Sequence, residues 1–186
     1  MRIGVLTIGN TDSEIIAWIK EHLTRAFPDT TSIVVNEKIP LREDSFDEKR
    51  KQYKSHMILS EVQSFAFRKP YLSRILGVVD ADIFVPKLNF VFGEASCPGK
   101  AALISLWRLK PEFYGNKLNI PLFLKRTLKE AVHELGHTLG LEHCLQPSCV
   151  MHFSHSISDT DKKQSYFCDK CYLHVKMCIK KLEQKS

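Results

Sequence analysis

Apolar and polar positions along the chain follow two spacings, and together they predict a strand–helix–strand opening. Residues 2–8 are apolar through their middle and end at Gly9, which is typical of a buried strand. Over residues 13–27 the apolar positions recur every three or four residues, as in an amphipathic helix. A second strand is predicted over residues 31–37. The chain therefore opens as a β-α-β unit.

The middle of the chain predicts a second helix and then a series of short strands. Residues 38–54 combine proline with many charges and predict a mobile excursion from the domain. Apolar spacing predicts another amphipathic helix over residues 57–67. Short strands are expected beyond it, with a turn at Pro98-Gly99 before the last, at residues 75–79, 82–85, 89–92 and 101–106.

The last third of the chain predicts two further helices. Pro121 suits the first turn of one helix, whose apolar residues up to Leu135 face a core. Asp159 or Thr160 can cap a final helix that runs towards Glu183. The order of these elements indicates a layered α/β fold with a mixed sheet, and a length of 186 residues suits one domain.

Residues 133–143 read HELGHTLGLEH, and their spacing predicts a zinc site with a free coordination position. His133 and His137 are four residues apart, so both lie on one face of a helix and reach one ion. Gly140 can take a left-handed conformation that ends the helix and lets His143 return as a third ligand. Three protein ligands leave the fourth position for water, which zinc activates near neutral pH.

Glu134 follows the first histidine and is the predicted general base and acid. Its carboxylate leans beside the ligand pair, where it can hold the water but is poorly placed to bind metal. The predicted reaction is peptide hydrolysis, in which Glu134 takes the proton of the water and delivers it to the leaving amine. Accidental spacing on an ordinary helix is the alternative, against which five agreeing positions argue.

Four cysteines downstream form a second candidate metal site. Four thiolates complete a closed tetrahedral shell, which is the pattern of structural zinc. The four are Cys144, Cys149, Cys168 and Cys171. Disulfides, or unrelated buried thiols, are the alternatives; a reducing compartment disfavours the disulfides, and no secretory signal is visible. Because the ligand His143 is adjacent to the first cysteine, the second ion should also stiffen the loop of the catalytic site.

The combination HExxHxxGxxHC, then Cys149-Val150-Met151, then a CxxC pair resembles the archaemetzincins, a branch of the metzincin zinc metallopeptidases. The resemblance implies a single layered metzincin-like domain, residues 1–186, with a twisted mixed sheet. Its upper subdomain would be residues 1–140, with the zinc helix, and its lower subdomain residues 141–186, with the third histidine and a C-terminal helix clamped by structural zinc. The resemblance assigns catalytic zinc to His133, His137 and His143, structural zinc to Cys144, Cys149, Cys168 and Cys171, acid–base chemistry to Glu134, and the Met-turn to Met151.

Two features of the cleft are expected from the same resemblance. In metzincins an edge strand above the cleft receives the substrate by strand addition, and the Phe90 to Phe92 run is the candidate, with an ordinary core strand as the alternative. Some metzincins carry a tyrosine two residues after the methionine, where Phe153 stands here without a hydroxyl. His152 or His155 is a candidate substitute, and a solvated loop histidine is the other interpretation.

Charge and hydropathy restrict the class of partner. The formal net charge is +6, and lysines such as Lys176 and Lys180 are spaced as on the solvated face of a helix. This favours a peptide or protein substrate over nucleic acid. No apolar run reaches the roughly 20 residues of a membrane helix, so we expect a cytoplasmic, monomeric enzyme. A zinc-stabilised binding or scaffold protein with little hydrolysis is the alternative.

Overall fold

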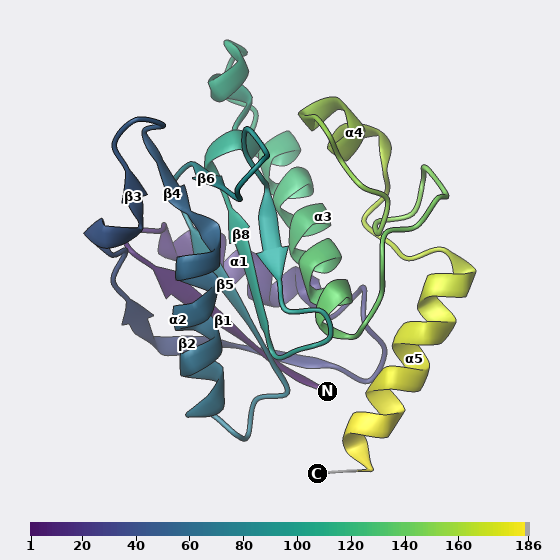
Figure 1. Cartoon of the computed structure of the whole chain (residues 1–186). Coiled ribbons are helices and arrows are strands. Elements are labelled where there is room, and N and C mark those ends of the chain that lie inside the picture. Colours follow the sequence, from purple (N-terminus) through teal and green to yellow (C-terminus); the bar gives the residue numbers. More distant parts are fainter. Residues whose placement is uncertain (185–186) are drawn as a thin grey trace.

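A five-stranded mixed sheet forms the centre of the computed structural model, which describes residues 1–184 (Figure 1). Four strands are parallel and the fifth, at one edge, is antiparallel to its neighbour. In spatial order they are β2 (Thr31–Ile39), β1 (Arg2–Ile8), β5 (Arg74–Val79), β8 (Ala101–Ser105) and β7 (Gly93–Ala95). The predicted α/β class with a mixed sheet is confirmed.

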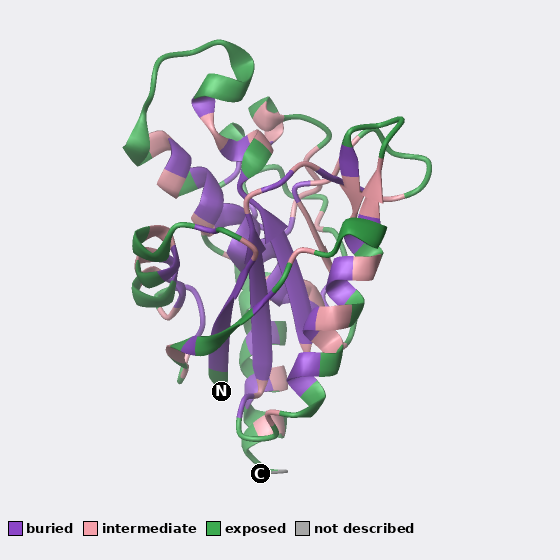
Figure 2. Cartoon of the chain, turned by 90° about the vertical axis from the view of Figure 1, so that its left-hand side faces the viewer, coloured by how far each residue is buried: buried purple, intermediate pink, exposed green. Residues whose placement is uncertain are grey.

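Helices cover both faces of this sheet, which explains why its strands are apolar almost throughout. One face carries α1 (Ser13–Leu23) and α3 (Ile120–Thr138), and the other carries α2 (Ser55–Phe67). Successive side chains of β8 alternate between the two cores: Ala102 and Ile104 pack in the first, Leu103 in the second. Figure 2 shows the central strands as buried, with exposed residues on the outer sides of the helices.

Residues 38–54 were expected to be a mobile excursion, and this prediction is wrong. They contain a 3-10 helix, η1 (Glu43–Ser45), and the strands β3 (Phe46–Asp47) and β4 (Gln52–Lys54). These strands form a second sheet with β6 (Ile83–Phe84), because β4 pairs with β6. Most of the charged residues that suggested mobility are exposed.

The predicted strand at residues 89–92 is also wrong, because the observed strand begins at Gly93, just after the predicted one ends. Phe92 still borders the sheet, since its carbonyl accepts a hydrogen bond from the Ser105 N–H at 2.8 Å. Its side chain is buried in the first core. The edge strand that the resemblance placed at Phe90 to Phe92 is therefore β7.

The C-terminal segment contains two helices where one was predicted. Helix α4 (Ile157–Lys162) begins at a capping box of Ser156 and Asp159, and it ends where Lys163 becomes extended. Helix α5 (Asp169–Glu183) begins after Cys168, which is its N-cap residue. The prediction was wrong because it placed the helix start at Asp159 or Thr160, which lie inside α4. Two further 3-10 helices, η2 (Trp107–Leu109) and η3 (Pro111–Tyr114), precede α3. Within residues 1–184 no helix has the length and apolar character needed to cross a membrane.

Candidate metal and catalytic site

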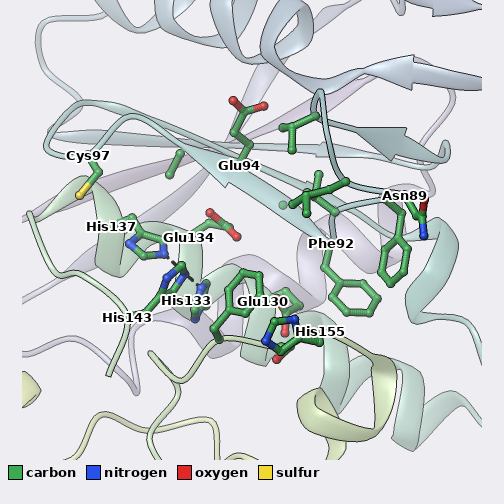
Figure 3. A pocket seen from close by; sticks show the side chains of 18 residues that line it. Asn89, Phe92, Glu94, Cys97, Glu130, His133, Glu134, His137, His143 and His155 are labelled. Carbon is green, nitrogen blue, oxygen red and sulfur yellow. Dashed lines mark hydrogen bonds between the residues drawn. The ribbon is translucent and has the colours of Figure 1, made fainter. Parts of the chain in front are cut away.

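The three predicted histidine ligands converge at the C-terminal end of α3. His133 and His137 lie one turn apart on this helix, and their Nε2 atoms are 3.1 Å apart (Figure 3). Gly140 has the left-handed φ of 85°, as expected, and the chain reverses there to bring in His143. One ring nitrogen from each of the three lies within 4.8 Å of the other two.

Hydrogen bonds orient two of these imidazoles for metal binding. The Nδ1 atom of His133 lies 2.7 Å from the Val150 carbonyl, and that of His137 lies 2.7 Å from the Leu141 carbonyl. Since a carbonyl only accepts, each Nδ1 carries the proton and each Nε2 keeps a free lone pair.

The protonation states of the histidines also fit a metal. Burial lowers the pKa of His133, His137 and His143 below that of a solvated histidine. Imidazoles with lowered pKa values are neutral near pH 7, the form that binds zinc. Three convergent neutral nitrogens are therefore a donor set that zinc fits.

Glu134 is buried beside the histidines and faces the same cleft (Figure 3). Burial raises its pKa well above the usual range, and the nearby charge of Glu130 adds to this effect. The residue therefore accepts a proton near neutral pH more readily than a solvated carboxylate does.

The cleft has a volume of about 430 Å³ and lies between α3, the chain around β7 and the loop after Met151. The helix supplies His133, His137, Glu130 and Glu134, and the segment after Gly140 supplies His143. The other two sides are lined by Phe90, Phe92, Glu94, Phe153 and His155. A pocket of this size, with aromatic walls beside the histidines and carboxylates, suits a peptide side chain next to the reacting groups.

Met151 packs directly against the zinc-binding segment of α3. A Cβ atom at Gly136 would lie only 2.4 Å from the Met151 Sδ atom. Met151 is fully buried, and its position under the turn between the two helical histidines requires a glycine there.

The two candidate histidines of the following loop have different surroundings. His152 turns away from the cleft, since its Nδ1 atom lies 2.9 Å from the Cys144 carbonyl. His155 lines the cleft, and its ring centroid lies 4.6 Å from that of Phe153. Phe153 in turn contacts His143, with ring centroids 4.7 Å apart.

The four predicted cysteine ligands also converge. Their sulfur atoms lie within 4.8 Å of one another, and all six cysteines of the chain are free of disulfides. The four are Cys144, Cys149, Cys168 and Cys171. Four thiols packed this closely, without a disulfide, form a donor set that a structural zinc ion fits.

The thiols of this cluster cannot all ionise in the absence of a cation. Burial raises the pKa of Cys149 and, together with the neighbouring sulfur atoms, that of Cys171. Burial also opposes ionisation of Cys168, but hydrogen bonds from Cys171 and the other thiols outweigh it and lower its pKa. One thiolate therefore suppresses the others, and a cation would relieve their repulsion.

Sequence analysis missed the residues that support Glu134. Glu130 lines the cleft one turn earlier on α3, and its Oε1 atom lies 3.0 Å from Nζ of the buried Lys163. Gly93 provides the space in which Glu134 lies, since a Cβ atom there would be 2.5 Å from the Glu134 Cγ atom. The helical spacing of Glu130 and Glu134 was a usable signal, whereas a lysine is rarely buried and gave none.

Comparison with known proteins gives matches over almost the whole chain. The profile of Peptidase family M54 matches residues 8–177. An archaemetzincin from Methanocaldococcus jannaschii is 40% identical over 186 residues, which cover 100% of this chain and 95% of the relative. One from Sulfolobus acidocaldarius is 42% identical over 171 residues, which cover 91% of this chain and 93% of the relative.

Solved structures match in the same way. The crystal structure of an archaemetzincin from Methanopyrus kandleri superposes with a TM-score of 0.84 at 32% identity, covering 97% of this chain and 96% of that one. An archaemetzincin from Archaeoglobus fulgidus, solved with malonate, gives a TM-score of 0.80 at 33% identity, covering 94% of this chain and 99% of that one.

Proposed function

Because this chain belongs to Peptidase family M54 and is a zinc-dependent metallopeptidase, we propose that His133, His137 and His143 hold its catalytic zinc. The convergence of their ring nitrogens within 4.8 Å carries this proposal. Cys144, Cys149, Cys168 and Cys171 would hold a second, structural zinc, so that each chain binds two ions. Met151 is the proposed Met-turn residue.

Glu134 is the proposed general base and acid. When bound, zinc would polarise the scissile carbonyl and increase the acidity of water. Glu134 would accept a proton from the attacking water and donate it to the leaving amine. Its position next to His133, its burial in the cleft and its raised affinity for a proton support this role. His155 lines the same cleft, and we propose that it contacts the substrate in place of the tyrosine hydroxyl that Phe153 lacks.

The substrate is a peptide or protein, and we propose that it binds extended along β7. This strand is the edge of the five-stranded sheet and lies beside the cleft, where Gly93, Glu94 and Ala95 are lining residues. Edge strands offer unpaired backbone groups to an added strand. We further propose that the enzyme is monomeric and that it is cytoplasmic. The second proposal rests on the free cysteines, which a reducing compartment keeps available for zinc.

Replacement of the proposed base tests the function. In the zinc-loaded Glu134→Ala variant, peptide cleavage should fall by a factor of about 100 or more, while the zinc content remains that of the parent. Glu142→Ala is the matched control, because Glu142 is an exposed carboxylate on the same segment. Full activity of Glu134→Ala would overturn the proposed mechanism. A parent protein that binds zinc but cleaves no member of a broad peptide library would favour the binding or scaffold alternative.

A further inference from the structure

We propose that Lys163 determines which substrate side chains the cleft accepts, because it neutralises Glu130 in the cleft floor. This inference rests on the proposed function, in which the cleft beside the three histidines receives a peptide. Lys163 follows α4 and does not itself line the cleft, whereas Glu130 does.

The two side chains form a buried ion pair. Nζ of Lys163 lies 3.0 Å from Oε1 of Glu130, and their side chains are 0% and 3% exposed. The Thr160 hydroxyl donates a second hydrogen bond to the same oxygen, at 3.1 Å. Water cannot screen a pair this deeply buried, so removal of either partner would leave an uncompensated charge beside the substrate.

Lys163 also connects the floor of the cleft with its wall. Its ammonium donates to the His152 carbonyl at 3.4 Å. The chain continues from His152 into Phe153, Ser154 and His155, all of which line the cleft. One buried cation therefore sets both the charge of the floor and the position of the adjacent loop.

The surfaces around this pair are aromatic. The Phe90 and Phe92 ring centroids are 5.1 Å apart on one side, and Phe153 and His155 form a second pair. Figure 3 shows Phe92, His155 and Glu130 at the same end of the cleft. At this end of the cleft, a neutralised Glu130 between aromatic walls suits an uncharged aromatic side chain, which loses no hydration of a charge on entering.

Binding of zinc-directed probes tests this inference without requiring turnover. We would measure, by calorimetry at pH 8, the affinities of three dipeptide hydroxamates that differ only in carrying a phenylalanine, lysine or glutamate side chain. The zinc-loaded parent should bind the phenylalanine probe at least about tenfold more tightly than either charged probe. In Lys163→Met the unpaired Glu130 should shift the lysine-to-phenylalanine affinity ratio by about tenfold towards lysine.

Two further variants keep the test decisive if Lys163→Met fails to fold. Glu130→Gln leaves the Lys163 ammonium unpaired, so the affinity ratio should shift by a similar factor towards the glutamate probe. The double variant Glu130→Gln/Lys163→Met has no charge at the pair and should prefer phenylalanine again. Lys162→Met is the matched control: it removes a charge from the adjacent residue, whose side chain is 74% exposed, and should leave all ratios unchanged.

The outcomes separate this inference from the proposed function. Ratios that stay the same in Lys163→Met and Glu130→Gln, or a parent that binds the three probes equally, would overturn the role of the pair while leaving the zinc site intact. Failure of the zinc-loaded parent to bind any hydroxamate would contradict the proposed catalytic site, and the inference would fail with it.

Discussion

Gly93 and Glu134 lie so close that no side chain fits between them. A Cβ atom at Gly93 would be 2.5 Å from Cγ and 2.7 Å from Oε1 of Glu134, and 2.6 Å from the Leu103 carbonyl oxygen. The first residue of the edge strand therefore forms a wall against the proposed base. This contact restricts the carboxylate to the cleft and holds it next to the histidines.

Gly93→Ala should reduce peptide cleavage with little loss of metal. The added methyl group must displace either the Glu134 side chain or the backbone of β8, and a displacement of about 1 Å at a reacting group lowers rates by about 100-fold. Measurement of kcat/KM together with zinc content checks this. Gly115→Ala is the control. Because Gly115 has a φ of 75°, this substitution should lower stability, but an added Cβ atom there has no neighbour within 4 Å and the rate of cleavage should not change. Unchanged kcat/KM in Gly93→Ala would show that the contact is unimportant.

Metal analysis should assign the two ligand sets separately. We expect about two zinc ions per chain in the parent. His143→Ala should chiefly lose the catalytic ion, whereas Cys168→Ser should chiefly lose the structural ion.

The two variants should also differ in stability. Structural zinc contributes on the order of 10 kcal/mol to folding, so the unfolding midpoint of Cys168→Ser should fall by at least about 10 °C and further than that of His143→Ala. Cys97→Ser, outside both sets, should retain both ions and the parental midpoint. A single zinc per parent chain, or loss of the same ion in both variants, contradicts the assignment.

Gly136→Ala should destabilise the protein although alanine favours helices. Alanine gains about 1 kcal/mol of helix propensity over glycine, but its methyl group would overlap the Met151 sulfur. Overpacking of this kind costs about 1–3 kcal/mol, so we expect a lower free energy of unfolding in urea. In the double variant Gly136→Ala/Met151→Ala, the removed side chain leaves space for the added methyl group. The double variant should therefore lose less stability than the sum of the losses in the two single variants. Additive losses would contradict this packing.

The pH dependence of stability should reveal the buried Lys129 ammonium. Burial lowers its pKa from 10.5 to about 8, and the nearby charge of Lys125 adds to this effect. Between these pH values the unfolded chain binds more protons than the folded chain, so the contribution of Lys129 to stability increases as the pH rises through this window. The free energy of unfolding of the parent should therefore increase relative to that of Lys129→Met from pH 8 to pH 10.5, by at most about 3 kcal/mol.

Lys176→Met provides the control for this measurement. Lys176 is exposed on α5 and is not among the charges that shift the pKa of Lys129, so this variant should leave the rise in stability between pH 8 and pH 10.5 in place. A difference between the parent and Lys129→Met that stays constant over this range would mean that the ammonium is solvated in the folded protein.

The zinc helix and its ligands were predictable because the information is local. Helical spacing brings His133 and His137 together, and a glycine that can adopt positive φ accounts for the return of His143. Each of these constraints spans only a few residues. The continuously apolar strands were predictable for a similar reason, since a sheet covered on both faces needs no alternation.

The features that sequence analysis missed depend on distant partners. Whether residues 89–92 or 93–95 form the strand depends on pairing with β8, which an apolar run does not specify. Lys163 is buried in an ion pair with Glu130. This partner lies 33 positions earlier in the chain, so no local pattern predicts the pair. The start of α4 is different: Ser156 and Asp159 are a capping box that was readable but was assigned to the wrong residue.

The free edge of β7 is three residues long, so backbone pairing along it extends over roughly 10 Å. A polypeptide can use that edge only while its own amides are unsatisfied, which helices and folded sheets do not allow. We therefore expect the enzyme to discriminate by local order: linkers, termini and partly unfolded chains are susceptible, and compactly folded proteins are not. Selection of this kind acts before any preference of the cleft for one side chain.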